Sequence, residues 1–413
     1  MKKILLLIFC LFLGFLSQPV HAEDFDAAAQ HAIAVDAKSG KILYEKNATT
    51  SVEVASISKL ITAYLVYEAI EDGKITLKTP VDISDYPYEL TLNPDISNIP
   101  MEARRYTVGE LLEAMLISSS NSAAIALAEK LAGSETQFVD VMRQKVESWG
   151  ITDAKLVNAS GLNNEHLDDH IYPKSDKDDE NKLSAYDVAI IARNLITDYP
   201  EILKITQKPT STFGGIPIQN SNYMLENMIS FRSGVDGLKT GSSEKAGESF
   251  VATTVQNGMR IITVVLKATE TEENPYVRFT TTSQLMSYIF RNFSAVTLVY
   301  KHDTYEDSSI AVMNGKKAHI PAVAQEDLTI IKQNGSQHSP EIHFKPDAKS
   351  IKAPIKKGQK LGTLTYSDSE LIGQGYLGQQ EPSVTMVAEK SIDRPFFLIA
   401  WWHDFVAFVN EKL

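Results

Sequence analysis

The periodicity of apolar and polar positions differs between successive parts of this chain. Residues 31–36 and 41–45 are short, partly alternating apolar runs joined by Ala37-Lys38-Ser39-Gly40, a pattern that predicts a β-hairpin. From residue 56 to about 206 the pattern is largely helical. Its helices are expected to open at polar capping signals, which are Thr107 with Glu110, Ser134 with Gln137, and Ser184 with Asp187.

Strand signals return after the helical stretch. Residues 248–256 and 259–268 flank Asn257-Gly258, the dipeptide that best fits a type I′ hairpin turn. Asn274-Pro275 then predicts a helix to about residue 292, with Pro in its first turn. Because strands stand at both ends of this region and helices lie between them, we expect one antiparallel sheet with outer strands from distant parts of the chain.

The pattern changes again beyond Phe293. Short β-rich runs alternate with glycines, as expected of a small all-β domain over residues 294–392. From residue 393 to 413 the apolar side chains cover one broad helical face, and His403 and Asp404 fall on the other. We expect an amphipathic helix that binds a membrane surface without crossing the membrane; packing on the all-β domain or in a dimer is the alternative.

The N-terminal residues predict export. Two lysines, an apolar stretch over residues 4–16 and the sequence Val20-His21-Ala22 indicate a signal peptide of residues 1–22. A retained anchor is the alternative, but the apolar stretch is shorter than the roughly 20 residues that a span needs. The single cysteine, Cys10, would leave with the signal peptide, so the exported chain would have no disulfide and no thiol nucleophile.

The net charge limits the possible partners, and the length predicts the number of domains. Without the signal peptide the chain carries 38 basic and 52 acidic residues, a formal charge of −14. Such a surface repels nucleic acid and anionic lipid, so no nucleic-acid partner is expected. The length exceeds what one hydrophobic core usually covers, which predicts two domains.

Ser56 and Lys59 are the first candidate reactive pair. They precede the apolar run 60–67, and on a helix residues three apart project from one face. Serine is a poor nucleophile until a base takes its proton, and lysine is such a base only where burial or a nearby cation keeps it neutral. The alternative is a helix N-cap followed by a solvated lysine. The same spacing recurs at Ser242 and Lys245, so the pair alone is not specific.

Two later motifs add matching chemistry. Ser119-Ser120-Asn121 lies between two predicted helices, where a hydroxyl can relay a proton and an amide can hold a substrate carbonyl; capping is the alternative. In residues 239–242, Lys239 supplies positive charge, Thr240 a donor for a carboxylate, and Gly241 room for a ligand backbone. Taken singly, this second motif also fits a strand end with a solvated lysine.

The three motifs occur together, in an order typical of β-lactamases and penicillin-binding proteins. With the opening residues 34–40 and the run DGLKTGSSEKAG at 236–247, the chain resembles a low-molecular-mass penicillin-binding protein of the D-alanyl-D-alanine carboxypeptidase family. The resemblance implies an α+β fold in which residues 23–293 form a penicillin-recognising serine transpeptidase/β-lactamase-like domain. The all-β domain (294–392) and an amphipathic anchoring helix (393–413) would follow it.

The resemblance also assigns catalytic roles. Ser56 would attack the penultimate D-alanine of a peptidoglycan stem peptide, Lys59 would be its base, and Ser119 would pass the proton to the leaving amine. Lys239 would help to keep Lys59 neutral, which we state as a physical hypothesis. Backbone N–H groups of Ser56 and Ser242 would stabilise the oxyanion. The other expected contacts to the substrate are Asn121, Lys239, Thr240, Gly241, Ser242 and Arg278.

Stem peptides ending in D-Ala-D-Ala and β-lactam antibiotics are therefore the expected partners. The resemblance places the protein at the outer face of the cytoplasmic membrane, and it implies no cofactor and no metal.

An acidic segment over residues 163–182 departs from the family pattern, and we expect a solvated loop over the cleft rim. His166 and His170 with Asp168 leave a metal site open as an alternative. Glu165 raises the alternative of a serine β-lactamase, although residue 169 is Asp where such an enzyme has Asn. A non-catalytic wall-binding or β-lactam-sensing protein is the remaining alternative.

Overall fold

The computed structural model describes residues 25–394 except 273 and 380, together with residues 406 and 409. The expected signal peptide lies outside the described residues, as does nearly all of the expected tail helix. Within the described part, no helix is both long enough and apolar enough to cross a bilayer.

A five-stranded antiparallel sheet forms the centre of the first domain, in the order β2-β1-β11-β10-β9. The N-terminal hairpin joins residues far along the chain through pairing of β1 with β11. Both predicted hairpins are confirmed, and positive φ angles at Asn257 (52°) and Gly258 (75°) fit the type I′ turn between β10 and β11. The strands are β1 (Ala29–Asp36), β2 (Ile42–Lys46), β9 (Val235–Ser243), β10 (Gly247–Gln256) and β11 (Met259–Ala268).

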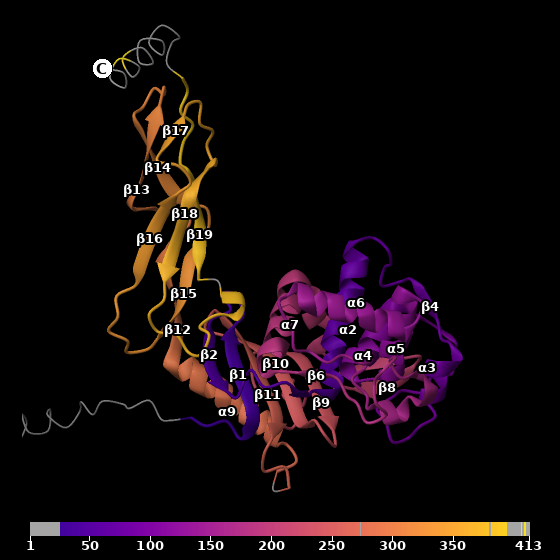
Figure 1. The fold of residues 1–413 in the computed structure, drawn as a ribbon. Helices are drawn as coiled ribbons and strands as arrows, with labels where there is room; N and C mark the ends of the chain where they lie inside the picture. The colour runs from indigo at the N-terminus through magenta and orange to yellow at the C-terminus, as the bar shows by residue number, and fades with distance from the viewer. Residues whose placement is uncertain (1–24, 273, 380, 395–405, 407–408, 410–413) are drawn as a thin grey trace, which may run out of the picture.

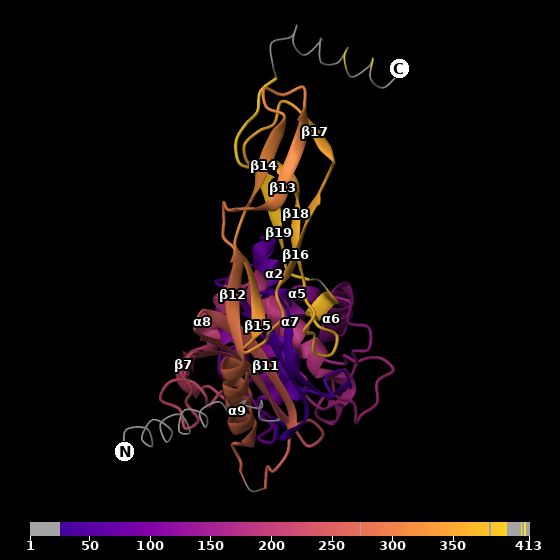
Figure 2. The same ribbon diagram turned by 90° about the vertical axis from the view of Figure 1, so that its left-hand side faces the viewer.

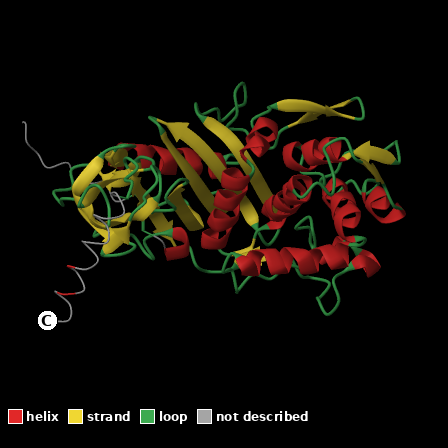
Figure 3. Cartoon of the chain, turned by 90° about the horizontal axis from the view of Figure 1, so that it is seen from above, coloured by secondary structure: helices red, strands yellow, loops and turns green. Residues whose placement is uncertain are grey.

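Helices cover both faces of this sheet (Figures 1 and 3). On one face α9 (Val277–Asn292) packs against β10 and β11, and on the other α7 (Ala185–Asp198) packs against β1 and β11. A helical region lies beyond α7, where α2 packs against α5 and α7. Its elements are α2 (Lys59–Glu71), α3 (Asp85–Leu90), α4 (Val108–Ile117), α5 (Asn121–Ala132), α6 (Glu135–Ser148), α8 (Leu203–Thr206) and the short strands β3 (Val52–Glu53), β4 (Pro80–Asp82), β5 (Arg105–Thr107), β6 (Lys182–Leu183), β7 (Thr210–Phe213) and β8 (Ile216–Gln219).

The capping signals largely behave as predicted. Thr107 with Glu110 and Ser184 with Asp187 form complete capping boxes, and the Ser134 hydroxyl accepts a hydrogen bond from the Gln137 N–H. The helix α9 starts two residues later than predicted. Asn274 accepts the N–H groups of Tyr276 and Val277 in a turn of its own, so Pro275 precedes the helix.

The second domain is all-β and rises from the first as a narrow column (Figure 2). A two-stranded ribbon, β12 (Phe293–Val299) with β15 (Leu328–Gln333), continues directly from α9. A six-stranded sheet follows in the order β16-β18-β19-β14-β13-β17. Its strands are β13 (Thr304–Met313), β14 (His319–Ala324), β16 (Glu341–Pro346), β17 (Ser350–Lys352), β18 (Lys360–Ser367) and β19 (Ser383–Ala388). The predicted α+β architecture with an all-β second domain is confirmed.

Candidate active site

Ser56 lies in a 3-10 turn, η1 (Ala55–Ser58), that leads directly into α2. Ala55 adopts a positive φ of 45°, and the Ser58 hydroxyl donates to the Ala55 carbonyl oxygen at 2.7 Å, which closes the turn. Val54 and Ser58 occupy the N-cap positions of the turn and of α2. The alternative of Ser56 as a helix N-cap is therefore wrong, and the Ser56 hydroxyl is left for other contacts.

Lys59 is fully buried and contacts three oxygen atoms. Its Nζ lies 2.9 Å from Ser56 Oγ and 2.7 Å from both Asn121 Oδ1 and the Ser160 carbonyl oxygen. The last two oxygens only accept hydrogen bonds, so each takes an N–H of the amine. The third contact is an N–H donation to Ser56 Oγ when Lys59 is charged, and when Lys59 is neutral its lone pair can accept the Ser56 hydroxyl proton. This geometry excludes the solvated-lysine alternative and suits proton abstraction from Ser56.

The electrostatic surroundings favour a neutral Lys59. Burial, and then the charge of Lys239, hold the pKa of Lys59 well below its ordinary value, and Glu135 opposes them. Burial and Arg278 in turn lower the pKa of Lys239 to about 7. The hypothesis that Lys239 disfavours a charged Lys59 therefore agrees with the structure.

Within residues 119–121, one residue caps a helix and the other two are left for other contacts. Ser120 is the N-cap of α5, since its hydroxyl accepts from the Ala123 N–H at 3.3 Å. This arrangement leaves buried Ser119, at a positive φ of 63°, and Asn121 for other roles. Asn121 receives Lys59 at Oδ1 and donates through Nδ2 to the Ser97 carbonyl oxygen at 2.9 Å. Its expected contact with a substrate peptide stays a prediction.

Strand β9 carries the third motif against the Ser56 turn. Lys239 is buried, so the alternative of a solvated strand-end lysine is wrong. A Cβ at Gly241 would lie 2.4 Å from the Val54 carbonyl oxygen and 3.1 Å from Ile57 Cγ1. The bare face of Gly241 therefore touches the turn, and its expected contact with a ligand backbone stays a prediction.

Arg278 of α9 reaches the same strand. Its Nη1 donates to Ser242 Oγ at 2.8 Å and to the Gly241 carbonyl oxygen at 3.2 Å, and its Nη2 pairs with Glu248. Burial lowers the pKa of Arg278, and Glu248 opposes this effect. The guanidinium is thus a largely buried group that contacts Gly241 and Ser242 of β9. The hydroxyl of Thr240, on the same strand, lies 2.8 Å from Ser221 Oγ.

A cavity of about 330 Å³ opens in front of Ser56, Asn121 and Ser242. The acidic segment over residues 163–182 supplies one wall through Asn163, Glu165, His166, Asp178 and Glu180, as expected of a loop at the cleft rim. Other parts of the lining are residues 95–97 and 243–245. Residues 95–97 carry no recognisable motif and were missed.

The metal alternative finds no support in the acidic segment. His166 Nε2 lies 3.6 Å from a Glu165 oxygen, whereas His170 stacks on the Tyr86 ring with centroids 3.8 Å apart. Over the described positions, no three His, Cys, Asp or Glu side chains gather as a metal site would require.

The segment over residues 158–161 is the main functional feature that the motifs did not reveal. Ser160 offers its carbonyl oxygen to Lys59, and a Cβ at Gly161 would lie 1.9 Å from the Ala55 carbonyl oxygen. Glu135 holds the same segment by accepting the Ala159 N–H at 2.8 Å. The run Asn158-Ala159-Ser160-Gly161 of small and polar residues was its one signal in the sequence.

Comparisons with known proteins agree with this geometry. A family model described as "D-alanyl-D-alanine carboxypeptidase" matches residues 17–270, and one described as "Penicillin-binding protein 5, C-terminal domain" matches residues 293–394. The D-alanyl-D-alanine carboxypeptidase DacC of Escherichia coli is 30% identical over 394 residues, 94% of this chain and 90% of the relative.

Two solved structures extend the likeness. A peptidoglycan synthesis regulatory factor (PBP3) from Streptococcus pneumoniae has a TM-score of 0.86 and 62% identity, over 89% of this chain and 100% of that chain. Penicillin-binding protein D2 from Listeria monocytogenes, in the ampicillin-bound form, has a TM-score of 0.54 and 29% identity, over 65% of this chain and 99% of that one.

Proposed function

This chain belongs to the D-alanyl-D-alanine carboxypeptidase family of serine peptidases, and we propose that it removes the terminal D-alanine of peptidoglycan stem peptides through an acyl-enzyme on Ser56. The observation that carries the proposal is the buried Lys59 amine, held by two acceptor-only oxygens with its third contact to Ser56 Oγ.

The proposed reaction begins with proton transfer from Ser56 to Lys59 as Oγ bonds to the carbonyl carbon of the penultimate D-alanine. Backbone N–H groups of Ser56 and Ser242 take up the negative charge on the carbonyl oxygen. The C–N bond then breaks, and the proton reaches the leaving amine through Ser119. Water hydrolyses the ester and regenerates Ser56.

Substrate placement is assigned to strand β9 and its neighbours. Lys239, Thr240 and Arg278 gather cations and a hydroxyl near Ser242, where the terminal carboxylate of a D-Ala-D-Ala peptide would bind. A β-lactam carries a carboxylate next to its reactive carbonyl and would acylate Ser56 in the same place. Asn121 at the cavity wall would face the peptide chain of the substrate.

The test is release of D-alanine from a peptide ending in D-Ala-D-Ala by the chain lacking residues 1–22. We expect release by the wild type, none above background by Ser56→Ala, and unchanged release by Ser148→Ala, a hydroxyl on the exposed side of α6. Absence of release by the folded wild type would instead favour a non-catalytic wall-binding or β-lactam-sensing protein.

A serine β-lactamase is the competing enzyme. It needs a carboxylate that activates water beside the acyl-enzyme, yet the Glu165 side chain is 62% exposed on the cavity rim, next to His166. We therefore expect Glu165→Gln to leave the lifetime of a penicillin adduct unchanged. Faster loss of the adduct in the wild type than in Glu165→Gln would support the β-lactamase.

We also propose that the protein works outside the cell, at the outer face of the cytoplasmic membrane. Arg394 Nε donates to the carbonyl oxygen of Ala353, the residue that follows β17. The β17 end of the column is the one away from the first domain (Figure 2). An apolar tail leaving from this end would bind the membrane and hold the catalytic domain above it. Co-sedimentation with vesicles of neutral lipid, lost on removal of residues 395–413, tests this proposal.

A further inference from the structure

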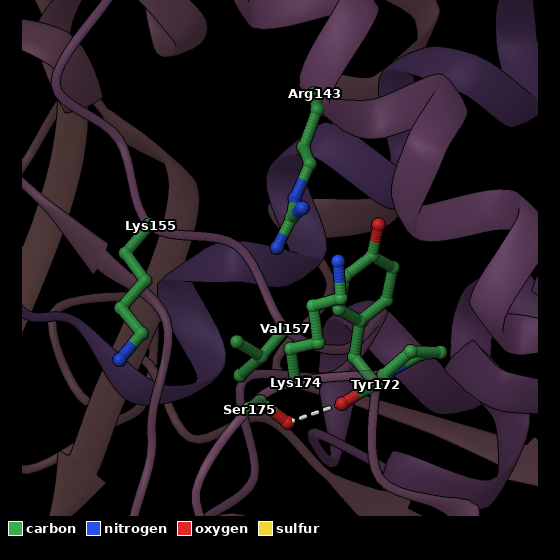
Figure 4. Close-up of a pocket in the computed structure, with 7 residues that line it drawn as sticks. Arg143, Lys155, Val157, Tyr172, Lys174 and Ser175 are labelled. Carbon is green, nitrogen blue, oxygen red and sulfur yellow. Dashed lines mark hydrogen bonds between the residues drawn. The ribbon is translucent and has the colours of Figure 1, made fainter.

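Helix α6 holds the segment that contacts Lys59 at two points. Glu135, its first residue, accepts the Ala159 N–H at 2.8 Å. Two turns later, Arg143 Nε donates to the Leu156 carbonyl oxygen at 2.9 Å. Figure 4 shows the Arg143 guanidinium directed toward the chain near Val157, in a hollow separate from the Ser56 cavity.

The same segment is bound from the other side by α2. Thr62 Oγ1 donates to the Ala159 carbonyl oxygen and Lys59 Nζ contacts the Ser160 carbonyl oxygen, both at 2.7 Å. The N–H that Glu135 accepts and the carbonyl oxygen that contacts Lys59 therefore belong to consecutive residues, Ala159 and Ser160. A displacement of the Glu135 carboxylate would move the Ser160 oxygen relative to the amine.

Glu135 is a carboxylate in an unusual place. It is buried, and its second oxygen accepts the Tyr86 hydroxyl at 2.9 Å. Burial, with a smaller contribution from Glu129 on α5, raises the pKa of Glu135 to about 7, whereas its hydrogen bonds and Lys59 on α2 oppose the rise. Its ionised form in turn raises the pKa of Lys59. These groups, with Tyr86 on α3, are the titratable neighbours that face the carboxylate.

We propose that Glu135 is a positioning residue for Lys59, fixing the Ser160 carbonyl oxygen against the amine and setting, by its own charge, the pH range in which the amine is neutral. The inference rests on the proposed function, since it concerns the base of that reaction. Protonated Glu135 permits a neutral Lys59, and ionised Glu135 favours the charged lysine.

The variant Glu135→Gln separates charge from hydrogen bonding, because an amide oxygen still accepts the Ala159 N–H. The readout is the second-order rate of Ser56 acylation by a fluorescent penicillin between pH 5 and 9. We expect the acid limb of Glu135→Gln to move to lower pH by about one unit, with a maximal rate close to that of the wild type. Glu135→Ala, which also loses the acceptor, should lose about tenfold in maximal rate, since the base is displaced.

Arg143→Gln is the matched control, because Arg143 holds the same segment without contacting Lys59 or Glu135. Its melting temperature should fall while the midpoint of its acid limb stays at the wild-type pH. A folded Glu135→Gln with the wild-type midpoint, or an equal shift in Arg143→Gln, would overturn the inference. A wild type that is acylated at no pH and releases no D-alanine would instead overturn the proposed function itself.

Discussion

The Asn121 amide oxygen lies 2.7 Å from the Lys59 amine, so a residue from the second motif contacts the lysine of the first, which we propose as the base. Asn121→Asp would place a carboxylate at this distance and raise the pKa of Lys59. We expect the acid limb of Ser56 acylation to move to higher pH by at least about one unit and the rate at pH 7 to fall about tenfold or more.

Asn121→Ala is the companion variant. It removes the acceptor without adding charge, so its maximal rate should fall while its acid limb does not move upward. Stopped-flow acylation by a fluorescent penicillin measures both quantities. An upward shift of equal size in both variants would show that the charge at residue 121 is not the cause.

The wild-type pH profile should reflect both buried lysines. Acylation should rise with pH through the depressed pKa of Lys59, because only the neutral amine accepts the Ser56 proton. Above about pH 7 the free enzyme loses the charge on Lys239, so kcat/KM for a substrate with a terminal carboxylate should fall, mainly through a rise in KM. Bound carboxylate favours charged Lys239, so the same limb in kcat should lie at higher pH.

An ester analogue of the substrate, which lacks the terminal carboxylate, provides the control for this profile. Its KM should not rise through pH 7, because it makes no ion pair with Lys239. The same alkaline limb in both substrates would assign the limb to another group.

Gly241 should tolerate no larger side chain. A Cβ there would lie 2.4 Å from the Val54 carbonyl oxygen, which is a backbone atom and cannot turn away as a flexible side chain could. We expect Gly241→Ala to lower the free energy of unfolding by about 1–3 kcal/mol and to slow Ser56 acylation, since the turn that carries Ser56 must move.

Gly335→Ala is the control for this substitution. Gly335 has a positive φ of 81° and no neighbour within 4 Å of a Cβ, so only the cost of the backbone conformation, about 1–2 kcal/mol, applies. Urea unfolding and acylation rates compare the two variants. Acylation by Gly241→Ala as fast as by Gly335→Ala would refute the close packing against the Ser56 turn.

Lys41 and Asp368 join the two domains by a buried ion pair of 2.6 Å. The Ile331 carbonyl oxygen accepts from the same amine, and the Tyr376 hydroxyl donates to the same carboxylate. Lys41→Met would leave the carboxylate buried without its cation, at a cost of about 3–5 kcal/mol in the free energy of unfolding.

Adding Asp368→Asn to Lys41→Met should recover part of this loss, because it removes the unpaired charge. Lys74→Met, which breaks an exposed pair with Asp72, should leave the melting temperature nearly unchanged. Differential scanning calorimetry measures all three variants. A loss no larger in Lys41→Met than in Lys74→Met would show that the buried pair does not hold the domains together.

Sequence patterns predicted the parts of the fold that local chemistry decides. Capping at Thr107, the Asn257-Gly258 turn and strand alternation depend on neighbours within a few residues, and the structure has them as expected. The start of α9 was predicted too early at Pro275, because proline is common in a turn before a helix as well as in the first turn of a helix.

The site residues that belong to the three sequence motifs were predictable. The contacts that form only when distant segments meet in the fold were not. Ser56, Lys59 and Asn121 meet as the motifs predicted. Contacts through backbone atoms have no side-chain signature, which is why the Ser160 carbonyl and its support from Glu135 were missed. For the same reason the close packing of Gly241 against the Ser56 turn was missed.

The central claim is that Ser56 is the nucleophile. Its most direct test is mass spectrometry of the protein after brief exposure to benzylpenicillin, followed by peptide mapping. We predict one added penicilloyl group, located on the peptide that contains Ser56 and absent from Ser56→Ala. A stable adduct on another residue, or the same adduct in Ser56→Ala, would contradict the account.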